Sequence, residues 1–172
     1  MKNKFEVRGN LVAIFLKRRD KSVIETVIDI GDLPKVQAFK GSWYAHWNKD
    51  IQSFYVAANV FEDGKRTITR LHRWLMDTPK GLVVDHKNHD TLKNTRENMR
   101  NVTGTVNMQN QRLRKSNTSG FRGVTWSRQR NKWLAQVRIN GKVTNLGRFT
   151  EIAEAIAVIS QARSRFMPGY IY

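Results

Sequence analysis

Short apolar runs separated by turn residues dominate the first third of the chain. Each run is five to eight residues long and rich in β-branched or aromatic residues, a pattern that predicts strands at 11–16, 23–30, 43–47 and 53–60. Asp63-Gly64 is a dipeptide that favours a tight hairpin turn. A short helix is predicted at 32–39. Residues 1–66 are therefore expected to be mainly β.

In the next stretch the spacing of apolar residues changes from that of a strand to that of a helix. Residues 69–76 have helical spacing, with Thr67 or Thr69 as the expected N-cap and an end before Pro79. A strand at 82–86, a polar loop and a second strand at 97–102 should then form a hairpin. Thr103 is the expected N-cap of a helix that runs to about residue 113. This β–loop–β–helix unit is assigned to residues 67–115.

The last third combines three strands with one helix. Residues 114–120 suggest a linker, and strands are predicted at 121–126, 133–139 and 143–149, with Asn140-Gly141 as a turn between the last two. In the middle strand Trp133, Ala135, Val137 and Ile139 alternate with polar residues and should pack on a helix at 151–166. Residues 116–172 are the third expected domain, and the class is α+β.

The net charge of the chain indicates a binding partner. The 172 residues include 31 Lys and Arg against 14 acids, a formal net charge of +17. Residues 98–150 contain no Asp or Glu, yet they contain 11 Lys or Arg together with several aromatic residues. Such a surface favours a polyanion, and double-stranded DNA is the expected partner.

Other classes of protein fit less well. Cysteine is absent, which excludes disulfides and thiolate zinc sites. The chain has neither a long apolar segment nor the apolar core of a signal peptide, so a cytoplasmic protein without membrane association is expected. No protein partner is implied.

The candidate chemistry lies in the predicted hairpin. Asp85-His86 is followed twelve residues later by Asn98, and Asn107 comes nine residues after that. A carboxylate beside an imidazole, with amides at fixed offsets, can place one hard divalent cation next to one general base. That combination is typical of phosphodiester hydrolysis.

Two segments resemble known families. Residues 70–112 are similar to HNH endonucleases of the phage and intron homing type, through Leu71-His72-Arg73, Gly81 to His86, Glu97 to Arg100, and Asn107 with Asn110. Residues 119–163 resemble an AP2-type DNA-binding domain, through 119–124, 132–138, 146–149 and 153–157. The order nuclease then AP2 also occurs in phage homing endonucleases.

The resemblance implies a ββα-metal nuclease mechanism. His86 would be the general base, Asp85 and Asn107 would bind one Mg²⁺ or Mn²⁺, and Asn98 would hold the hairpin and orient the base without touching substrate. Cleavage would leave 5′-phosphate and 3′-hydroxyl ends. Relatives of this layout can act as monomers on a long asymmetric site. His72 is expected to be a packing residue and His89 a loop residue.

The AP2 resemblance and the strand alternation together supply the expected DNA contacts. Gln136 and Arg138 lie on the polar side of the middle strand, where a sheet in the major groove can reach base edges. The full expected set is Arg122, Thr125, Trp126, Arg128, Arg130, Lys132, Gln136, Arg138 and Asn145.

Three functions of different class are consistent with these features. A metal-dependent DNA endonuclease explains both the site and the charge. A DNA-binding regulator with an inactive hairpin is the main alternative, although Asp85, His86 and Asn107 are all present. A basic RNA-binding or ribosome-associated protein would explain the charge but not the spacing of the site.

Overall fold

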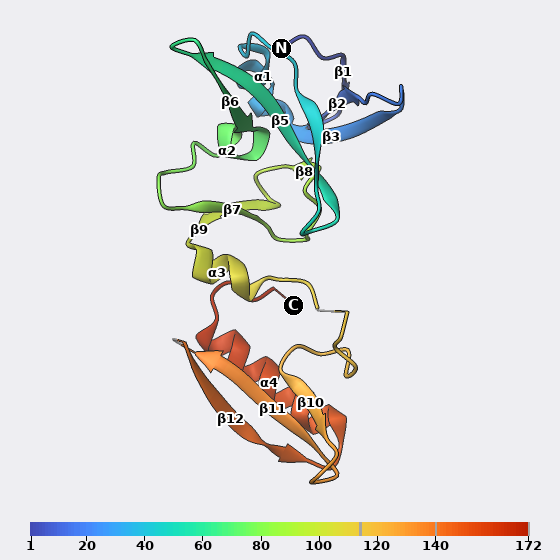
Figure 1. Ribbon diagram of the computed structural model, residues 1–172, viewed down its shortest axis with the longest axis vertical. Helices are drawn as coiled ribbons and strands as arrows, with labels where there is room; N and C mark the ends of the chain where they lie inside the picture. The colour runs from blue at the N-terminus through green and yellow to red at the C-terminus, as the bar shows by residue number, and fades with distance from the viewer. Residues whose placement is uncertain (114, 140, 172) are drawn as a thin grey trace. The chain divides into compact units, whose positions relative to one another are not determined.

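The protein, as a computed structural model that describes residues 1–113, 115–139 and 141–171, is mixed α and β (Figure 1). It divides into two compact units, Met1–Gly104 (unit 1) and Thr105–Tyr172 (unit 2). The α+β class is confirmed. The three domain boundaries expected from the sequence stay predictions. Within unit 1, the β-rich segment and the following hairpin share one core.

Unit 1 is built from short sheets. One sheet has the order β1-β2-β3-β8, with strands Phe5–Arg8, Leu11–Lys17, Val23–Asp29 and Lys93–Asn94. A second has the order β4-β5-β6, with strands Tyr44–Asn48, Ser53–Glu62 and Lys65–Arg70. A two-stranded sheet joins β7 to β9, at Val83–His86 and Met99–Val102. The helical segments are η1 (Ile30–Asp32), α1 (Leu33–Gln37) and α2 (Leu71–Leu75).

The two-residue strand β8 brings the loop of the hairpin to the N-terminal sheet. It pairs parallel with β3, with Val27 opposite Lys93 and Ile28 opposite Asn94. All other strand pairs of the described chain are antiparallel. The polar loop between the hairpin strands is therefore anchored by backbone hydrogen bonds rather than left on the surface.

Helix α2 begins later than the sequence suggested. Thr67 and Thr69 lie in strand β6, so the prediction that one of them caps the helix is wrong, and the extended residue Arg70 precedes Leu71 without a side-chain cap. Continuous antiparallel pairing with β5 extends β6 up to Arg70, which lies opposite Ala57. The β-branched threonines also suit a strand. The β5–β6 turn matches its prediction, because Asp63 and Gly64 have φ values of 49° and 72°.

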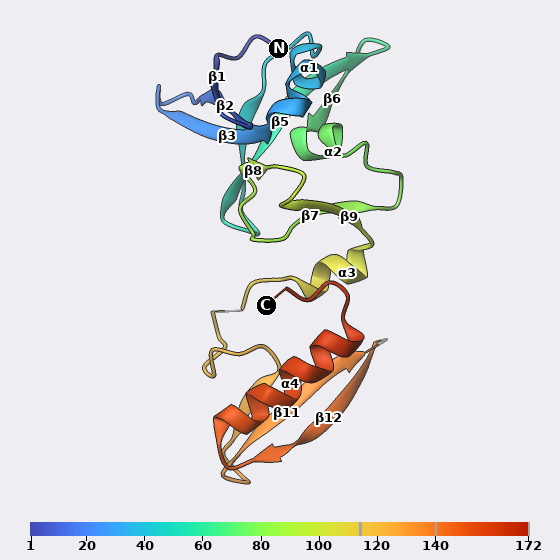
Figure 2. The ribbon, with the colours of Figure 1, turned by 180° about the vertical axis from the view of Figure 1, so that it is seen from behind.

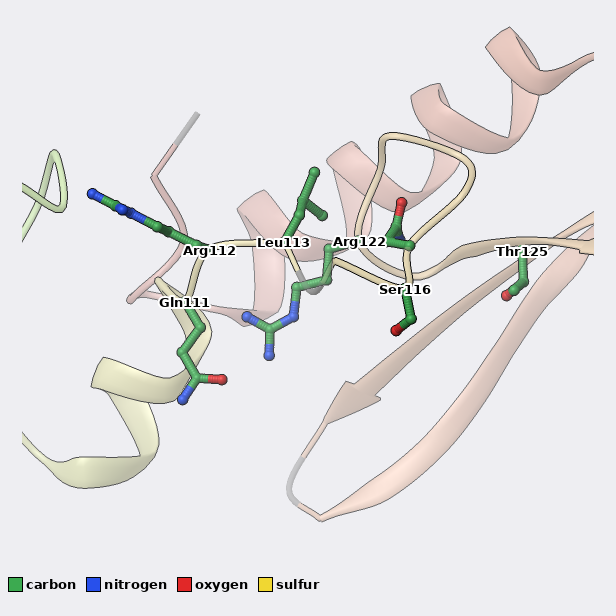
Figure 3. Close-up of a pocket in the computed structure, with 7 residues that line it drawn as sticks. Gln111, Arg112, Leu113, Ser116, Arg122 and Thr125 are labelled. Atoms are coloured by element: carbon green, nitrogen blue, oxygen red, sulfur yellow. The ribbon is translucent and has the colours of Figure 1, made fainter. Parts of the chain in front are cut away.

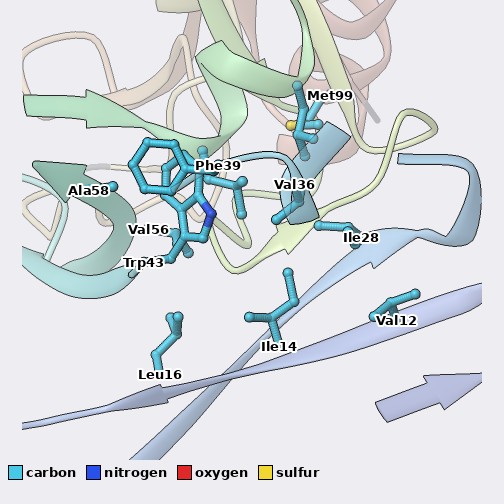
Figure 4. Packing of buried hydrophobic residues seen from close by; sticks show 12 residues of the cluster. Val12, Ile14, Leu16, Ile28, Val36, Phe39, Trp43, Val56, Ala58 and Met99 are labelled. Carbon is cyan, nitrogen blue, oxygen red and sulfur yellow. The ribbon is translucent and has the colours of Figure 1, made fainter. Parts of the chain in front are cut away.

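A single apolar core connects the N-terminal strands to the hairpin (Figure 4). Val12, Ile14 and Leu16 alternate along β2 and are fully buried. They belong to one cluster with Leu71 of α2 and Met99 of β9. Burying such side chains stabilises the fold by about 1.5–3 kcal/mol each. The β-rich segment thus supports the strands that carry Asp85 and His86.

Helix α3 (Gly104–Gln109) begins at the last residue of unit 1, and its other residues belong to unit 2. The rest of unit 2 is a three-stranded sheet covered by one helix. The sheet has the order β10-β11-β12, with strands Val124–Ser127, Lys132–Ile139 and Lys142–Phe149. Helix α4 (Ile152–Phe166) lies against one face of this sheet (Figures 1 and 2).

The predicted apolar face of the middle strand is confirmed. Ala135 and Val137 of β11 are buried together with Ala155 and Ile159 of α4. Helix α3 ends at Gln109, several residues before the expected end. Two sequence predictions touch residues outside the described ranges, namely Asn140 in the β11–β12 turn and Arg114 in the linker.

None of the helices in the described parts of the chain combines the length and the apolar character needed to cross a bilayer.

Candidate functional site

The β7–β9 hairpin fixes the backbone of Asp85 and His86. Asp85 lies directly opposite Arg100 in the antiparallel register, and His86 lies opposite Met99. Arg100 donates from Nε and Nη2 to the same Asp85 oxygen, Oδ2, at 2.9 and 2.7 Å. Asp85 is only 4% exposed. This cross-strand ion pair offsets much of the cost of burying the carboxylate.

A chain of buried hydrogen bonds determines which nitrogen of His86 carries the proton. The Thr26 hydroxyl donates to the Leu92 carbonyl at 2.7 Å, so its oxygen accepts from Asn94 Nδ2 at 2.9 Å. Asn94 must then present its carbonyl oxygen Oδ1 to His86 Nε2, 3.1 Å away. A carbonyl oxygen only accepts, so Nε2 carries the hydrogen and Nδ1 is the basic nitrogen of the neutral ring.

The surroundings of His86 favour the neutral imidazole. It is 5% exposed, and burial lowers its pKa, with the Asn94 hydrogen bond and the nearby Asp85 acting in the opposite direction. A neutral, buried imidazole with a fixed tautomer is suited to accept a proton.

Two further rings pack around His86. The His72 ring stands edge-on to it, with centroids 5.3 Å apart and planes at 87°, and Tyr55 lies 6.4 Å from it. Burial is the main cause that lowers the pKa of His72 to about 3, assisted by His86, Arg70 and Arg73. His72 is a packing residue, as predicted, but the group on which it packs is the candidate base.

Asn98 ties the loop between the two strands. Its Oδ1 accepts from the Asn88 amide at 3.1 Å, and its Nδ2 donates to the carbonyls of Lys93 and Asp90 at 2.8 and 3.3 Å. These bonds brace the loop between β7 and β9. His89, in the same loop, has a φ of 63°, a left-handed conformation that glycine adopts most easily.

Asn107, the second expected metal ligand, lies on α3 in unit 2. No cluster of three or more His, Asp or Glu side chains suited to a metal occurs in the described ranges. A cation at Asp85 would therefore have to draw most of its ligands from amides, water or substrate oxygens, which is the usual situation for Mg²⁺.

The expected DNA-contact residues of unit 2 fall into separate places. Residues directly opposite in antiparallel strands share a face, and Thr125 pairs with Leu134 and Gln136 with Asn145. Together with Arg138 they form the sheet face opposite α4, which we call the open face. Arg148 pairs with Leu134 and so belongs to this face too, although the sequence prediction did not include it. The exposed turn before β11 contributes Arg128 and Arg130, and Lys132 begins that strand.

Two expected contacts lie elsewhere. Trp126 pairs with Trp133 on the side of the sheet that α4 covers, with ring centroids 5.0 Å apart, although Trp126 remains 39% exposed. It is therefore not part of the open face. Arg122 precedes β10, and its Nη1 donates to the carbonyls of Met108 and Gln109 at 2.9 and 3.3 Å. Arg122 also lines a pocket with polar side chains that include Gln111, Arg112, Ser116 and Thr125 (Figure 3).

The sequence reasoning missed four residues around His86, namely Thr26, Tyr55, His72 as a contact of the base, and Asn94. For Asn94 a signal existed, since it lies eight residues after His86 in the polar loop of the predicted hairpin. Thr26 and Tyr55 carried no such signal, because they lie 60 and 31 residues before His86.

His72 makes the stability of unit 1 dependent on pH. Its pKa is about 3 in the folded chain and about 6.5 when unfolded. Below about pH 6.5 the unfolded chain therefore binds one more proton than the folded chain, and the free energy of unfolding falls by up to about 1.4 kcal/mol per pH unit. His72→Phe should remove this one-proton slope in urea unfolding at pH 7, 6 and 5, and exposed His46→Phe should leave it unchanged. Equal slopes for wild type and His72→Phe would contradict the assignment.

Comparison with known proteins gives one curated relative. No protein-family model matches the chain, and no solved structure matches it. Over 85 residues the chain is 35% identical to "Protein 3.8" of Escherichia phage T7, an alignment that covers 49% of this chain and 69% of that protein. At this identity and coverage, the chain belongs to the same family as phage T7 Protein 3.8.

Proposed function

We propose that the protein is a metal-dependent DNA endonuclease of the HNH homing type, in which an AP2-like sheet selects the site. The observation that supports this most is the hydrogen bonding of His86: its Nε2–H is directed to Asn94 Oδ1, and burial lowers the pKa of the ring. A donor fixed at Nε2 leaves Nδ1 unprotonated, which is what a general base requires.

His86 would take the proton of a water molecule through Nδ1. The water oxygen forms a bond to phosphorus as the bond from phosphorus to the 3′-oxygen breaks, and the products carry 5′-phosphate and 3′-hydroxyl ends. The imidazolium formed in this step keeps its Nε2–H bond to Asn94, 3.1 Å away, and the negative charge of Asp85 stabilises it. Both interactions favour the protonated ring and so assist the transfer.

Asp85 and Asn107 are the proposed holders of the divalent cation, Mg²⁺ or Mn²⁺. Their carboxylate and amide oxygens suit a hard cation. The bound ion would stabilise the negative charge that develops on the phosphate and the departing oxygen. Asp85 accepts two hydrogen bonds from Arg100 at Oδ2, so Arg100 would be a fixed neighbour of the cation.

The open face of unit 2 is the proposed contact with DNA bases. Gln136 and Arg138 stand on the central strand of this face, and Thr125 and Asn145 flank them on the neighbouring strands. Arg128, Arg130 and Lys132 lie at one end of the sheet, where they would hold phosphates. The absence of acids from residues 98–150 supports this assignment.

One observation favours the alternative, a DNA-binding regulator without nuclease activity. Arg100 occupies an oxygen of Asp85, and both Asp85 and His86 are largely buried. If this ion pair excludes the cation, the hairpin is only a structural element.

His86→Ala distinguishes the two functions. We expect the wild-type protein to nick or cut supercoiled plasmid with Mg²⁺ but not with EDTA, and His86→Ala to lower the rate by about 10²–10⁴-fold, the usual contribution of a general base. His46→Ala is the matched control, because His46 is exposed on β4 of the same unit. A wild-type protein that binds DNA but never cuts it would establish the regulator.

Arg138→Ala tests base reading on the open face. Once the preferred site has been selected from a library of random duplexes, we expect the variant to lose about 1–3 kcal/mol of affinity for that site and much less for unrelated DNA. Arg130→Ala should weaken both equally and reduce the salt dependence of binding, because a phosphate contact is independent of sequence. Equal losses on both duplexes for Arg138→Ala would show that it contacts only phosphate.

A further inference from the structure

Arg163 is a buried arginine in the last turns of α4. It is 7% exposed, and burial lowers the pKa of its guanidinium. Nη2 donates to the Gln109 carbonyl at 3.1 Å, and Nη1 donates to the Arg122 carbonyl at 3.4 Å. A charged group is costly to bury, so the burial of Arg163 needs an explanation beyond packing.

The contacts of Arg163 converge on the C-terminal end of α3. The Gln109 carbonyl accepts from Arg163 Nη2 and from Arg122 Nη1, while Arg122 Nη1 also donates to the Met108 carbonyl. The last carbonyls of a helix lack partners within it and carry partial negative charge. Two guanidinium groups therefore cap this helix end.

The chain beyond α4 holds α3 from the same end. The Gly169 amide donates to Gln109 Oε1 at 2.8 Å, and the Tyr170 ring lies under the Arg163 guanidinium, with Cζ 4.0 Å from the ring centroid. The approach at Gly169 is tight, because a Cβ added there would lie 2.1 Å from the Val106 carbonyl oxygen. Only glycine fits at this position.

Helix α3 needs outside support to keep a defined position. It has six residues, Gly104–Gln109, and a helix of this length does not persist in water on its own. Asn107 is one turn or less from the carbonyls that Arg163 and Arg122 cap. A ligand amide must be held within about 0.5 Å to be useful to a metal.

We infer that Arg163, with Gly169 and Tyr170, is a positioning residue for Asn107, the cation ligand proposed on α3. This inference rests on the proposed function for the role of Asn107. The holding of α3 itself rests only on contacts within unit 2. Lysine cannot replace Arg163, because one ammonium group cannot reproduce the planar fork that reaches two carbonyls and stacks on a ring.

The test compares Arg163→Lys with Arg165→Lys in the full-length protein. Arg165 is two residues away on α4, is exposed, and lies over the Phe166 ring, so it controls for the chemical change. Arg163→Lys should raise the Mg²⁺ concentration that gives half-maximal plasmid cleavage by about 10- to 100-fold, the usual effect of losing a group that supports a ligand. Affinity for DNA in EDTA should change by less than about twofold, since the open face is untouched.

Hydrogen exchange gives a second measurement that does not depend on cleavage. Amides of residues 107–110 should exchange faster in Arg163→Lys than in Arg165→Lys, and faster in Gly169→Ala than in Gly31→Ala, where an added methyl group meets nothing within 4 Å. Unchanged exchange at 107–110 would overturn the holding of α3. Faster exchange with an unchanged Mg²⁺ requirement would overturn the positioning role. If the wild-type protein cuts no DNA, the proposed function fails, and exchange alone still decides whether Arg163 holds α3.

Discussion

The hydrogen bond between Asn94 Oδ1 and His86 Nε2 is the contact on which the proposed chemistry depends. It is one link in a buried chain that begins at the Leu92 carbonyl and passes through the Thr26 hydroxyl. Each link fixes the direction of the next, because a carbonyl can only accept and a hydroxyl has one hydrogen to donate. The outcome is an imidazole whose tautomer is set by a strand 60 residues earlier in the sequence.

This chain explains why the β-rich segment and the hairpin form one unit. Parallel pairing of β3 with β8 places Thr26 and Asn94 side by side. The apolar core that includes Ile28 of β3 and Met99 of β9 packs the N-terminal sheet against the β7–β9 hairpin. The ring of His72 completes the enclosure of His86 from α2. The N-terminal third of the protein, for which the sequence indicated no function, is thus the support of the candidate base.

The sequence predicted those features that depend on local pattern. Short apolar runs gave β2 and β3, alternating apolar residues gave the apolar face of β11, and Asp63-Gly64 gave its hairpin turn. Contacts between distant segments could not be predicted this way: β8 has only two residues, and its pairing to β3 depends on tertiary folding. The site was anticipated in its hairpin members, Asp85, His86 and Asn98, but not in Thr26 or Tyr55. The face of Trp126 was predictable in principle, since pairing with Trp133 sets it, but that needs the register of the hairpin.

The most direct test of the account is ¹⁵N NMR of the His86 ring in metal-free protein at neutral pH. Protonated Nε2 and unprotonated Nδ1 are expected, and Thr26→Val should weaken this preference, because Asn94 would lose the acceptor that orients its amide. A ring protonated at Nδ1, or an imidazolium at neutral pH, would contradict the assignment of His86 as a neutral base with Nδ1 as its proton acceptor.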